Sequence, residues 1–367
     1  MIKKLLMLFT LPIMIITLIS CVSSTKYDVI ATLYPQYDMA RYISGDELSV
    51  KLILPYGTSP HDFEPTSNEM KMIEDASLIL LTSYELEPWL VDLEHDNKEN
   101  LEELIGTEYT DHDDHDGDDH DDHDGDEHDG DDHDDHDGDD HDGDNHDDHD
   151  GDNHDDHDGD DHDDHNDDNH DDHHHHDHAD IHYWTRPNAM MAMVREVAEL
   201  LAHISPENQE LFMARKEEYI EKINSFSDEL NEFLHEYEDT NIKLFMAGHN
   251  AMGEFAEYFG FEIVSLYPDF IPDAELTSQE ISNFIELIKE NNVLSLFLEP
   301  LFEAAPVAAE AISSDLASEG YILEFFELSQ FHNISESEAS ENMTLFEIYR
   351  NNIENIKMVI KSNYGER

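Results

Sequence analysis

The segment from Asp111 to His178 constrains the fold more than any other, because it cannot contribute to a hydrophobic core. It holds 20 of the chain's 27 histidines and 37 of its 91 acidic residues, with no lysine or arginine. Such a composition predicts a disordered segment in the absence of bound metal. The folded part has to come from the flanking residues, roughly 280 after removal of a leader, which suffice for one large domain or two lobes.

The charge of the chain points to cations as partners. The formal net charge is −73, and outside the segment Asp111–His178 the balance of 54 acidic against 18 basic residues is still −36. Binding to nucleic-acid phosphates needs clustered lysine and arginine, so this composition argues against a nucleic-acid partner. A cation is the natural ligand of so acidic a protein.

Residues 1–20 are typical of a bacterial signal peptide. Two lysines precede an apolar run from Leu5 to Ile19, which is short for a bilayer span. The run ends in "LISC", which resembles the bacterial lipoprotein box, so Cys21 is predicted to carry lipid and residues 21–26 to form a tether. Cys21 is the single cysteine, which excludes an intrachain disulfide. The alternative is an ordinary signal peptide or an anchor helix in which Cys21 occurs by chance.

Short apolar strands alternate with helices on both sides of the acidic segment, which predicts parallel sheets covered on both faces. In the first half, strands are expected within Tyr27–Pro35, Val50–Pro55 and Ala76–Ser83, and a capping box opens a helix at Thr66 and Glu69. In the second half, strands are expected within "IKLFMAG", "FEIVSLYP", "VLSLFLEP" and "YILEFFELS". Helices are expected between them, one of them opened by a capping box at Thr277 and Glu280, and an amphipathic helix is expected to end near Ile360.

This alternation predicts an α/β protein with two lobes and a rigid helix between them. Residues 27–110 and 179–204 are assigned to the first lobe, residues 205–238 to the linking helix and residues 239–367 to the second lobe. Ser205 and Pro206 begin a stretch without further glycine or proline that would span roughly 45 Å as a helix. Ligands of such folds lie at the carboxyl ends of the strands, here a cleft between the lobes.

Seven histidines lie outside the acidic segment, and three of them occupy loops where a ligand would be needed. His61 and His249 follow expected strands, and His182 precedes an expected helix. Three converging imidazoles suit Zn²⁺ and the borderline first-row metals, whereas hard ions prefer oxygen ligands. Of the other four, His95, His203 and His235 are expected at the surface, and the position of His332 is left open.

The residues around these three histidines carry a family resemblance. The stretches "TLYPQYDMARYISGDELSVKLILPYGTSPHDFEPTSNEM", "DIHYWTRPNAM", "AGHNAMGEFAEYFGFE" and "FLEPLFEAAPVAAEAISSDLASEG" resemble segments of the metal-binding lipoproteins of bacterial ABC importers, the ZnuA/TroA-like solute-binding proteins. The resemblance implies that His61, His182 and His249 are metal ligands. Manganese-selective members tend to carry a carboxylate where His249 stands, so this residue favours zinc.

The sequence departs from the family pattern at three places. Ile181 stands where proline is usual, and Arg186 stands where an acid is usual, but neither position supplies a ligand. The family often has aspartate after the final strand, and Glu327 is the nearest equivalent, so Glu327 is predicted to be the fourth ligand. Water, Glu64, His332 or a histidine of the acidic segment remain alternatives for that place.

Zinc-specific members of the family commonly insert a loop rich in histidine and acid where the segment Asp111–His178 lies. Its repeat places an imidazole beside carboxylates every two to five residues, which predicts many weak metal sites that collect cations near the tight site. The weak ligands include His112, His115, His120, His123, His173, His174, His175, His176 and His178. The alternatives are a solubilising polyanion or a calcium binder, although the repeat matches neither calcium-binding pattern.

Together these features predict a monomeric, lipid-anchored, extracytoplasmic protein that captures Zn²⁺ and delivers it to the membrane permease of an ABC importer. An enzyme is not expected, because the sequence lacks the motifs HExxH and GxSxG and the phosphate-binding loop. Two alternatives stay open. One is a solute-binding protein for Mn²⁺ or another divalent metal, and the other is a metal-dependent surface adhesin.

Overall fold

The structure, a computed structural model, describes residues 26–106, 181–267, 276–302 and 304–365. The predicted leader, Cys21 and the segment Asp111–His178 lie outside the described residues. Within the described ranges the strands form two four-stranded sheets, and all the neighbouring strands run parallel. The prediction of an α/β fold built on parallel sheets is therefore confirmed.

The first sheet has the strand order β2-β1-β3-β4. Its strands are β1 (Val29–Ala31), β2 (Val50–Leu52), β3 (Leu78–Leu81) and β4 (Lys98–Asn100). Its helices are α1 (Tyr34–Ser44), α2 (Ser67–Glu74) and α3 (Leu101–Ile105). The short strand β4 was not expected, because its residues are polar. As an edge strand it pairs with β3 alone, so one side needs no apolar cover.

The second sheet has the strand order β6-β5-β7-β8. Its strands are β5 (Lys243–His249), β6 (Glu262–Tyr267), β7 (Ser295–Leu298) and β8 (Glu324–Glu327). Its helices are α6 (Gly253–Tyr258), α7 (Ser278–Glu290), α8 (Ala304–Ser318), α9 (Glu336–Ser340) and α10 (Leu345–Tyr364). The expected capping boxes at Thr66 and Thr277 are both present, and each sets the first turn of its helix.

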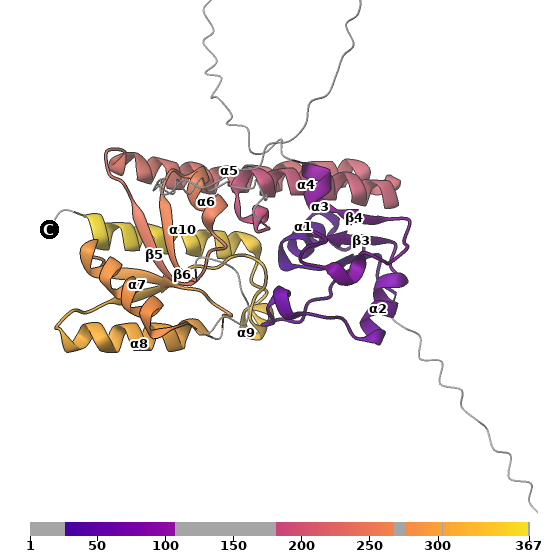
Figure 1. The fold of residues 1–367 in the computed structure, drawn as a ribbon. Coiled ribbons are helices and arrows are strands. Elements are labelled where there is room, and N and C mark those ends of the chain that lie inside the picture. Colours follow the sequence, from indigo (N-terminus) through magenta and orange to yellow (C-terminus); the bar gives the residue numbers. More distant parts are fainter. Residues whose placement is uncertain (1–25, 107–180, 268–275, 303, 366–367) are drawn as a thin grey trace, which may run out of the picture. The chain divides into compact units, whose positions relative to one another are not determined.

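Helices α4 (Pro187–Ile204) and α5 (Gln209–Leu234) lie against one another (Figure 1). Along the chain they stand between the last strand of the first sheet and the first strand of the second. Helix α5 is shorter than the expected range 205–238, because 3₁₀ turns flank it at Pro206–Asn208 and His235–Tyr237. Its first half binds α1 through a hydrogen bond from Tyr219 to Asp38. Its second half binds α10 through the ion pair of Glu229 with Lys357. The long helix thus contacts helices of both sheets.

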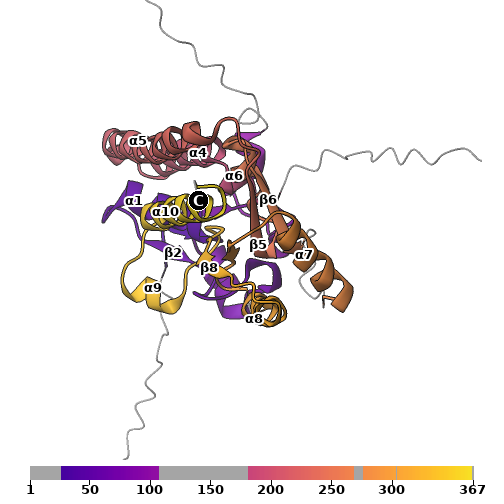
Figure 2. The same ribbon diagram turned by 90° about the vertical axis from the view of Figure 1, so that its left-hand side faces the viewer.

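The apolar core follows the two faces of each sheet. Helices α7 and α8 cover one face of the second sheet, and α6 and α10 pack on the other (Figure 2). In the first sheet, alternate residues of β1 and β3 face α2 on one side and α1, α3 and α4 on the other. These buried strands explain why the sequence shows continuous apolar runs. None of the helices in the described ranges is both long and apolar enough to cross a membrane.

Candidate metal centre

His61 belongs to a 3₁₀ turn, η1 (Pro60–Asp62), that follows the loop after β2. The Ser59 hydroxyl caps this turn by accepting a hydrogen bond from the His61 backbone N–H at 3.3 Å. Pro60 begins the turn, where its missing N–H costs nothing. The cap and the proline hold the backbone of His61 at the carboxyl end of the first sheet.

His182 precedes the 3₁₀ turn η4 (Tyr183–Thr185), which is fastened on both sides. The Tyr183 hydroxyl donates to the carbonyl of Thr82 beyond β3, and the Trp184 indole N–H donates to the carbonyl of Gln330 beyond β8, each at 2.9 Å. At the end of the turn, the guanidinium of Arg186 pairs with Glu254 of α6 at 3.1 Å. These bonds connect the His182 segment to residues of both sheets.

His249 is the last residue of β5 rather than the first loop residue that the sequence suggested. The strand extends because His249 still pairs with Tyr267 of β6, after an irregularity in register that begins at Met246. His249 is 3% exposed, as is His182, while His61 is partly buried. All three histidines therefore lie at the carboxyl ends of strands or in the turn that faces them.

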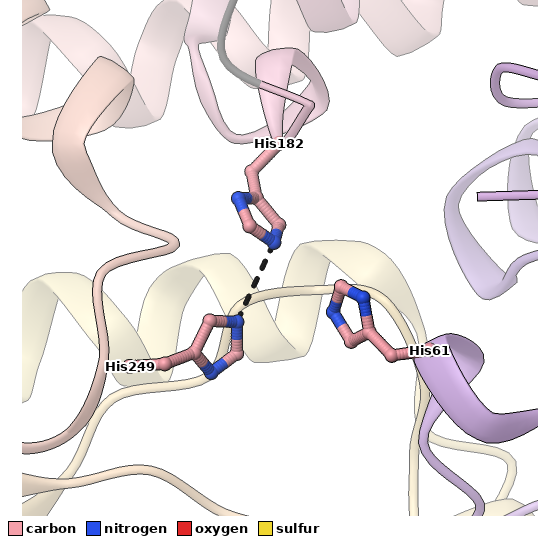
Figure 3. Close-up of side chains that lie close together, drawn as sticks. All are labelled: His61, His182 and His249. Atoms are coloured by element: carbon pink, nitrogen blue, oxygen red, sulfur yellow. Dashed lines mark hydrogen bonds between the residues drawn. The ribbon is translucent and has the colours of Figure 1, made fainter. Parts of the chain in front are cut away.

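The three imidazoles converge on one point, as Figure 3 shows. One ligand nitrogen from each of His61, His182 and His249 lies within 4.8 Å of the other two. The Nε2 atoms of His182 and His249 are 3.4 Å apart. Tetrahedral zinc with Zn–N distances of about 2.0–2.1 Å separates two ligand nitrogens by about 3.4 Å, so this spacing fits a shared zinc ion.

The carboxylate of Glu299 orients the His249 ring. It lies at the end of β7, is 4% exposed, and has an oxygen 2.8 Å from Nδ1 of His249. It also accepts the backbone N–H of His249 at 2.8 Å. A carboxylate on Nδ1 favours the tautomer that leaves Nε2 free to bind a metal, and it fixes the orientation of the ring.

Burial and the neighbouring imidazole rings keep His61 and His332 neutral at physiological pH. Burial, together with the nearby His182, His249 and His332 rings, lowers the pKa of His61 to about 2. Burial and the His249 and His182 rings lower the pKa of His332 to about 3. Only a neutral imidazole has a free lone pair for a metal, so His61 is able to bind a cation at neutral pH.

The structure separates the predicted site residues into two groups. His61, His182 and His249 come together, whereas Glu327 is exposed at the end of β8 and is not part of the described cluster of ligand atoms. Glu64 is also exposed. His203 is exposed on α4, and the His235 side chain is 78% exposed, as expected for surface histidines. The predicted loop ligands and Cys21 lie outside the described residues.

Two buried residues that contact His249, Glu299 and Gln330, were not predicted from the sequence, and the place of His332 was left open. Glu299 follows β7 directly, and β7 is the neighbour of β5 in the sheet. His61 and His249 were selected because they follow expected strands, and the same criterion applied to carboxylates would have selected Glu299. Gln330 is buried with Nε2 3.4 Å from Nδ1 of His249, and no local pattern marked it.

The fold and the cluster of histidines define a two-sheet α/β protein with three imidazoles placed so that they could hold a metal ion. The chain belongs to the family described as zinc-uptake complex component A, periplasmic, whose model matches residues 29–359.

Two relatives in sequence and one solved structure are similar to this chain. The zinc-binding protein AdcA of Streptococcus pyogenes serotype M3 is 23% identical over 340 residues, which cover 91% of this chain and 56% of AdcA. The high-affinity zinc uptake system protein ZnuA of Bacillus subtilis is 22% identical, over 92% of this chain and 89% of ZnuA. The structure of the periplasmic zinc binding protein TroA from Treponema pallidum has the same fold, with a TM-score of 0.64 and 17% identity over 91% of this chain and 99% of TroA. The chain thus spans about half of the length of AdcA but most of ZnuA.

Proposed function

We propose that this chain is the extracytoplasmic zinc-binding component of an ABC-type importer, which captures Zn²⁺ and delivers it to the membrane permease. The observation that carries this proposal is the convergence of His61, His182 and His249, with ligand nitrogens within 4.8 Å of one another. Imidazole ligands suit zinc, whereas carboxylate and water oxygens suit manganese. Membership of the zinc-uptake family supports the same metal.

His332 is our candidate for the fourth ligand, in place of Glu327. His332 is buried, at 6% exposure. The rings of His249 and His182 are close enough to contribute, after burial, to the lowered pKa of His332. His332 lies outside the group of three histidines whose ligand atoms are within 4.8 Å of one another, so its ring would have to approach the ion on binding.

Four imidazoles would close the coordination shell of the ion. Catalytic zinc keeps an open position for water or substrate, whereas a closed tetrahedral shell holds the metal without activating water. This difference supports a role in which zinc is the cargo rather than a catalyst, and we do not propose an enzymatic activity.

We also propose that Cys21 anchors the protein to the bacterial membrane and that the chain acts there as a monomer. The segment Asp111–His178 would collect zinc through its 20 histidines and raise the local supply to the tight site. Each flexible site has to lose conformational freedom on binding, so it should be weaker than the site formed by the two sheets.

Zinc titration of the purified chain tests the central proposal. Free zinc is fixed by a chelator buffer, and binding at the tight site is followed by the fluorescence of Trp184, whose ring centroid lies 5.3 Å from that of His182. Alanine at His61, His182 or His249 should weaken tight binding more than 100-fold, beyond the 10–100-fold typical of an outer-shell partner. His203→Ala and His235→Ala are the controls. Equal affinities in all five variants would refute the site.

A further inference from the structure

The segment that follows β8, Gln330–Ile334, is buried although it has no regular secondary structure. Buried backbone groups need hydrogen-bond partners, and a strand or helix would supply them locally. In this segment three backbone carbonyls, those of Gln330, His332 and Ile334, find their partners in distant parts of the chain. They lie in three stretches of sequence: at Tyr34, in the loop before His61, and beside His182.

Several bonds connect this segment to the histidine-bearing parts of the site. The Gln330 carbonyl accepts from the Trp184 indole, two residues after His182, at 2.9 Å. The His332 carbonyl accepts from the Tyr34 backbone N–H at 3.1 Å. The Ile334 carbonyl accepts from the Gly57 N–H at 2.8 Å, within the loop that leads to His61.

Asn333 makes the most specific of these connections. Its Nδ2 donates to the carbonyls of Pro55 and Thr58, both at 2.8 Å, while its Oδ1 accepts the Ile334 N–H at 2.9 Å. The two carbonyls lie on either side of the turn at Gly57, which has a φ of 77°. A primary amide carries two N–H donors in one plane, so an asparagine can hold both ends of this turn at once.

We propose that Asn333 is a positioning residue for the zinc site, which fixes the loop carrying His61 against the segment that carries His332. The inference rests on the proposed zinc site and goes beyond it. His61 reaches the cluster from the first sheet, while His249 comes from the second, so their separation depends on contacts between distant segments. Asn333 supplies two such contacts three to six residues before His61. A metal site loosened at one ligand binds more weakly, although its ligands are unchanged.

The test compares Asn333→Ala and Asn333→Asp with the matched control Asn363→Ala in the full chain. Asn363 is an amide clamp of the same kind, since its Oδ1 accepts from the N–H groups of Leu294 and Ser295 and its Nδ2 donates to the Ser295 carbonyl. It fastens α10 to β7 at the strand end opposite Glu299. The readouts are zinc affinity in chelator buffers, followed by Trp184 fluorescence, and the visible spectrum of bound Co²⁺, which reports ligand geometry.

Both Asn333 variants should lower zinc affinity by about 10–100-fold and change the Co²⁺ spectrum. Asn333→Asp should have the larger effect, because its carboxylate faces two carbonyl oxygens without a proton to donate. Asn363→Ala should lower the melting temperature but leave affinity and spectrum unchanged. Equal affinity of the parent and both Asn333 variants would overturn the inference, as would an equal loss in Asn363→Ala.

A double-mutant cycle with His61→Ala identifies the route of the effect. If Asn333 acts through His61, Asn333→Ala should change zinc affinity little in the His61→Ala background, whereas additive losses would contradict this route. Should the Asn333 variants fail to fold, Gly57→Ala strains the same turn from the other side, since its φ is positive while its Cβ would meet open space. It should weaken zinc in the same direction, and unchanged affinity would refute the inference. A parent chain without a tight site would instead refute the proposed function itself.

Discussion

Gly248 lies so close to Glu299 that a Cβ atom on Gly248 would stand 2.6 Å from both Cβ and Oε2 of Glu299. The glycine immediately before His249 therefore leaves room for the carboxylate that orients the His249 ring. Glu299 can occupy its place beside His249 only because Gly248 has no side chain.

Gly248→Ala should weaken zinc binding without removing a ligand. The new methyl group has to displace Glu299, and loss of an outer-shell carboxylate typically lowers metal affinity by about 10–100-fold. Glu299→Ala should cause a loss of similar size, and Glu299→Gln a smaller one, because one amide oxygen can still accept a hydrogen bond. Zinc titration measures each variant, and an unchanged affinity of Gly248→Ala would contradict the assigned role of Glu299.

The fourth ligand can be identified by comparing two alanine variants. His332→Ala should lower zinc affinity about tenfold or more and alter the Co²⁺ spectrum, because water would replace an imidazole. Glu327→Ala should leave both unchanged, since this carboxylate is exposed whereas His332 is buried. The opposite result would assign the fourth position to Glu327, as the sequence suggested.

Deletion of Asp111–His178 separates the collecting segment from the tight site. The deleted chain should lose most of its zinc stoichiometry, since 20 histidines are removed, but keep one tight equivalent. Import should then fail only when zinc is scarce. Equilibrium dialysis against zinc counts the bound ions. If the deleted chain still binds several zinc ions, the segment is not the collector, and its interpretation as a solubilising polyanion is the one that stands.

Stability should depend on pH through the buried carboxyl of Glu87. Burial raises its pKa from 4.5 to about 6, although Thr32, Ser83 and Thr82 donate hydrogen bonds to it. A raised carboxyl pKa means that the folded state holds the proton more tightly, so stability is lost as pH rises through the folded pKa. Between pH 4 and pH 7 the loss should amount to about 2 kcal/mol.

Glu87→Gln isolates this effect, because every other titrating group is shared with the parent. The unfolding free energy of the parent minus that of the variant should decrease by about 2 kcal/mol from pH 4 to pH 7, measured by urea denaturation. A difference that is independent of pH would show that Glu87 titrates normally in the folded protein.

Cys21→Ser tests the lipid anchor. Cleavage and lipidation at a lipoprotein box require the cysteine thiol, so the variant should leave the membrane fraction or accumulate with its leader attached. Cell fractionation and mass of the mature N-terminus provide the measurement. Unchanged processing and membrane partition would identify residues 1–20 as an ordinary signal peptide or an anchor helix.

The sequence by itself predicted the class of fold, and it singled out the three histidines that the structure brings together. Buried parallel strands have to be apolar throughout, so β1, β3 and β5 were visible as short apolar runs between helices. His61 and His249 were found because ligands gather at the carboxyl ends of such strands. The edge strand β4 was missed, because its residues are polar and no apolar run marks its pairing with β3.

Only the tertiary structure decided the surroundings of those histidines. Glu299 faces His249 because β7 pairs with β5, although 50 residues separate them in the chain. Asn333 bonds to the loop before His61, more than 270 residues away in the chain. Local sequence patterns report the periodicity of a helix or strand, whereas these contacts depend on how distant segments pack, so they are established only when the chain has folded.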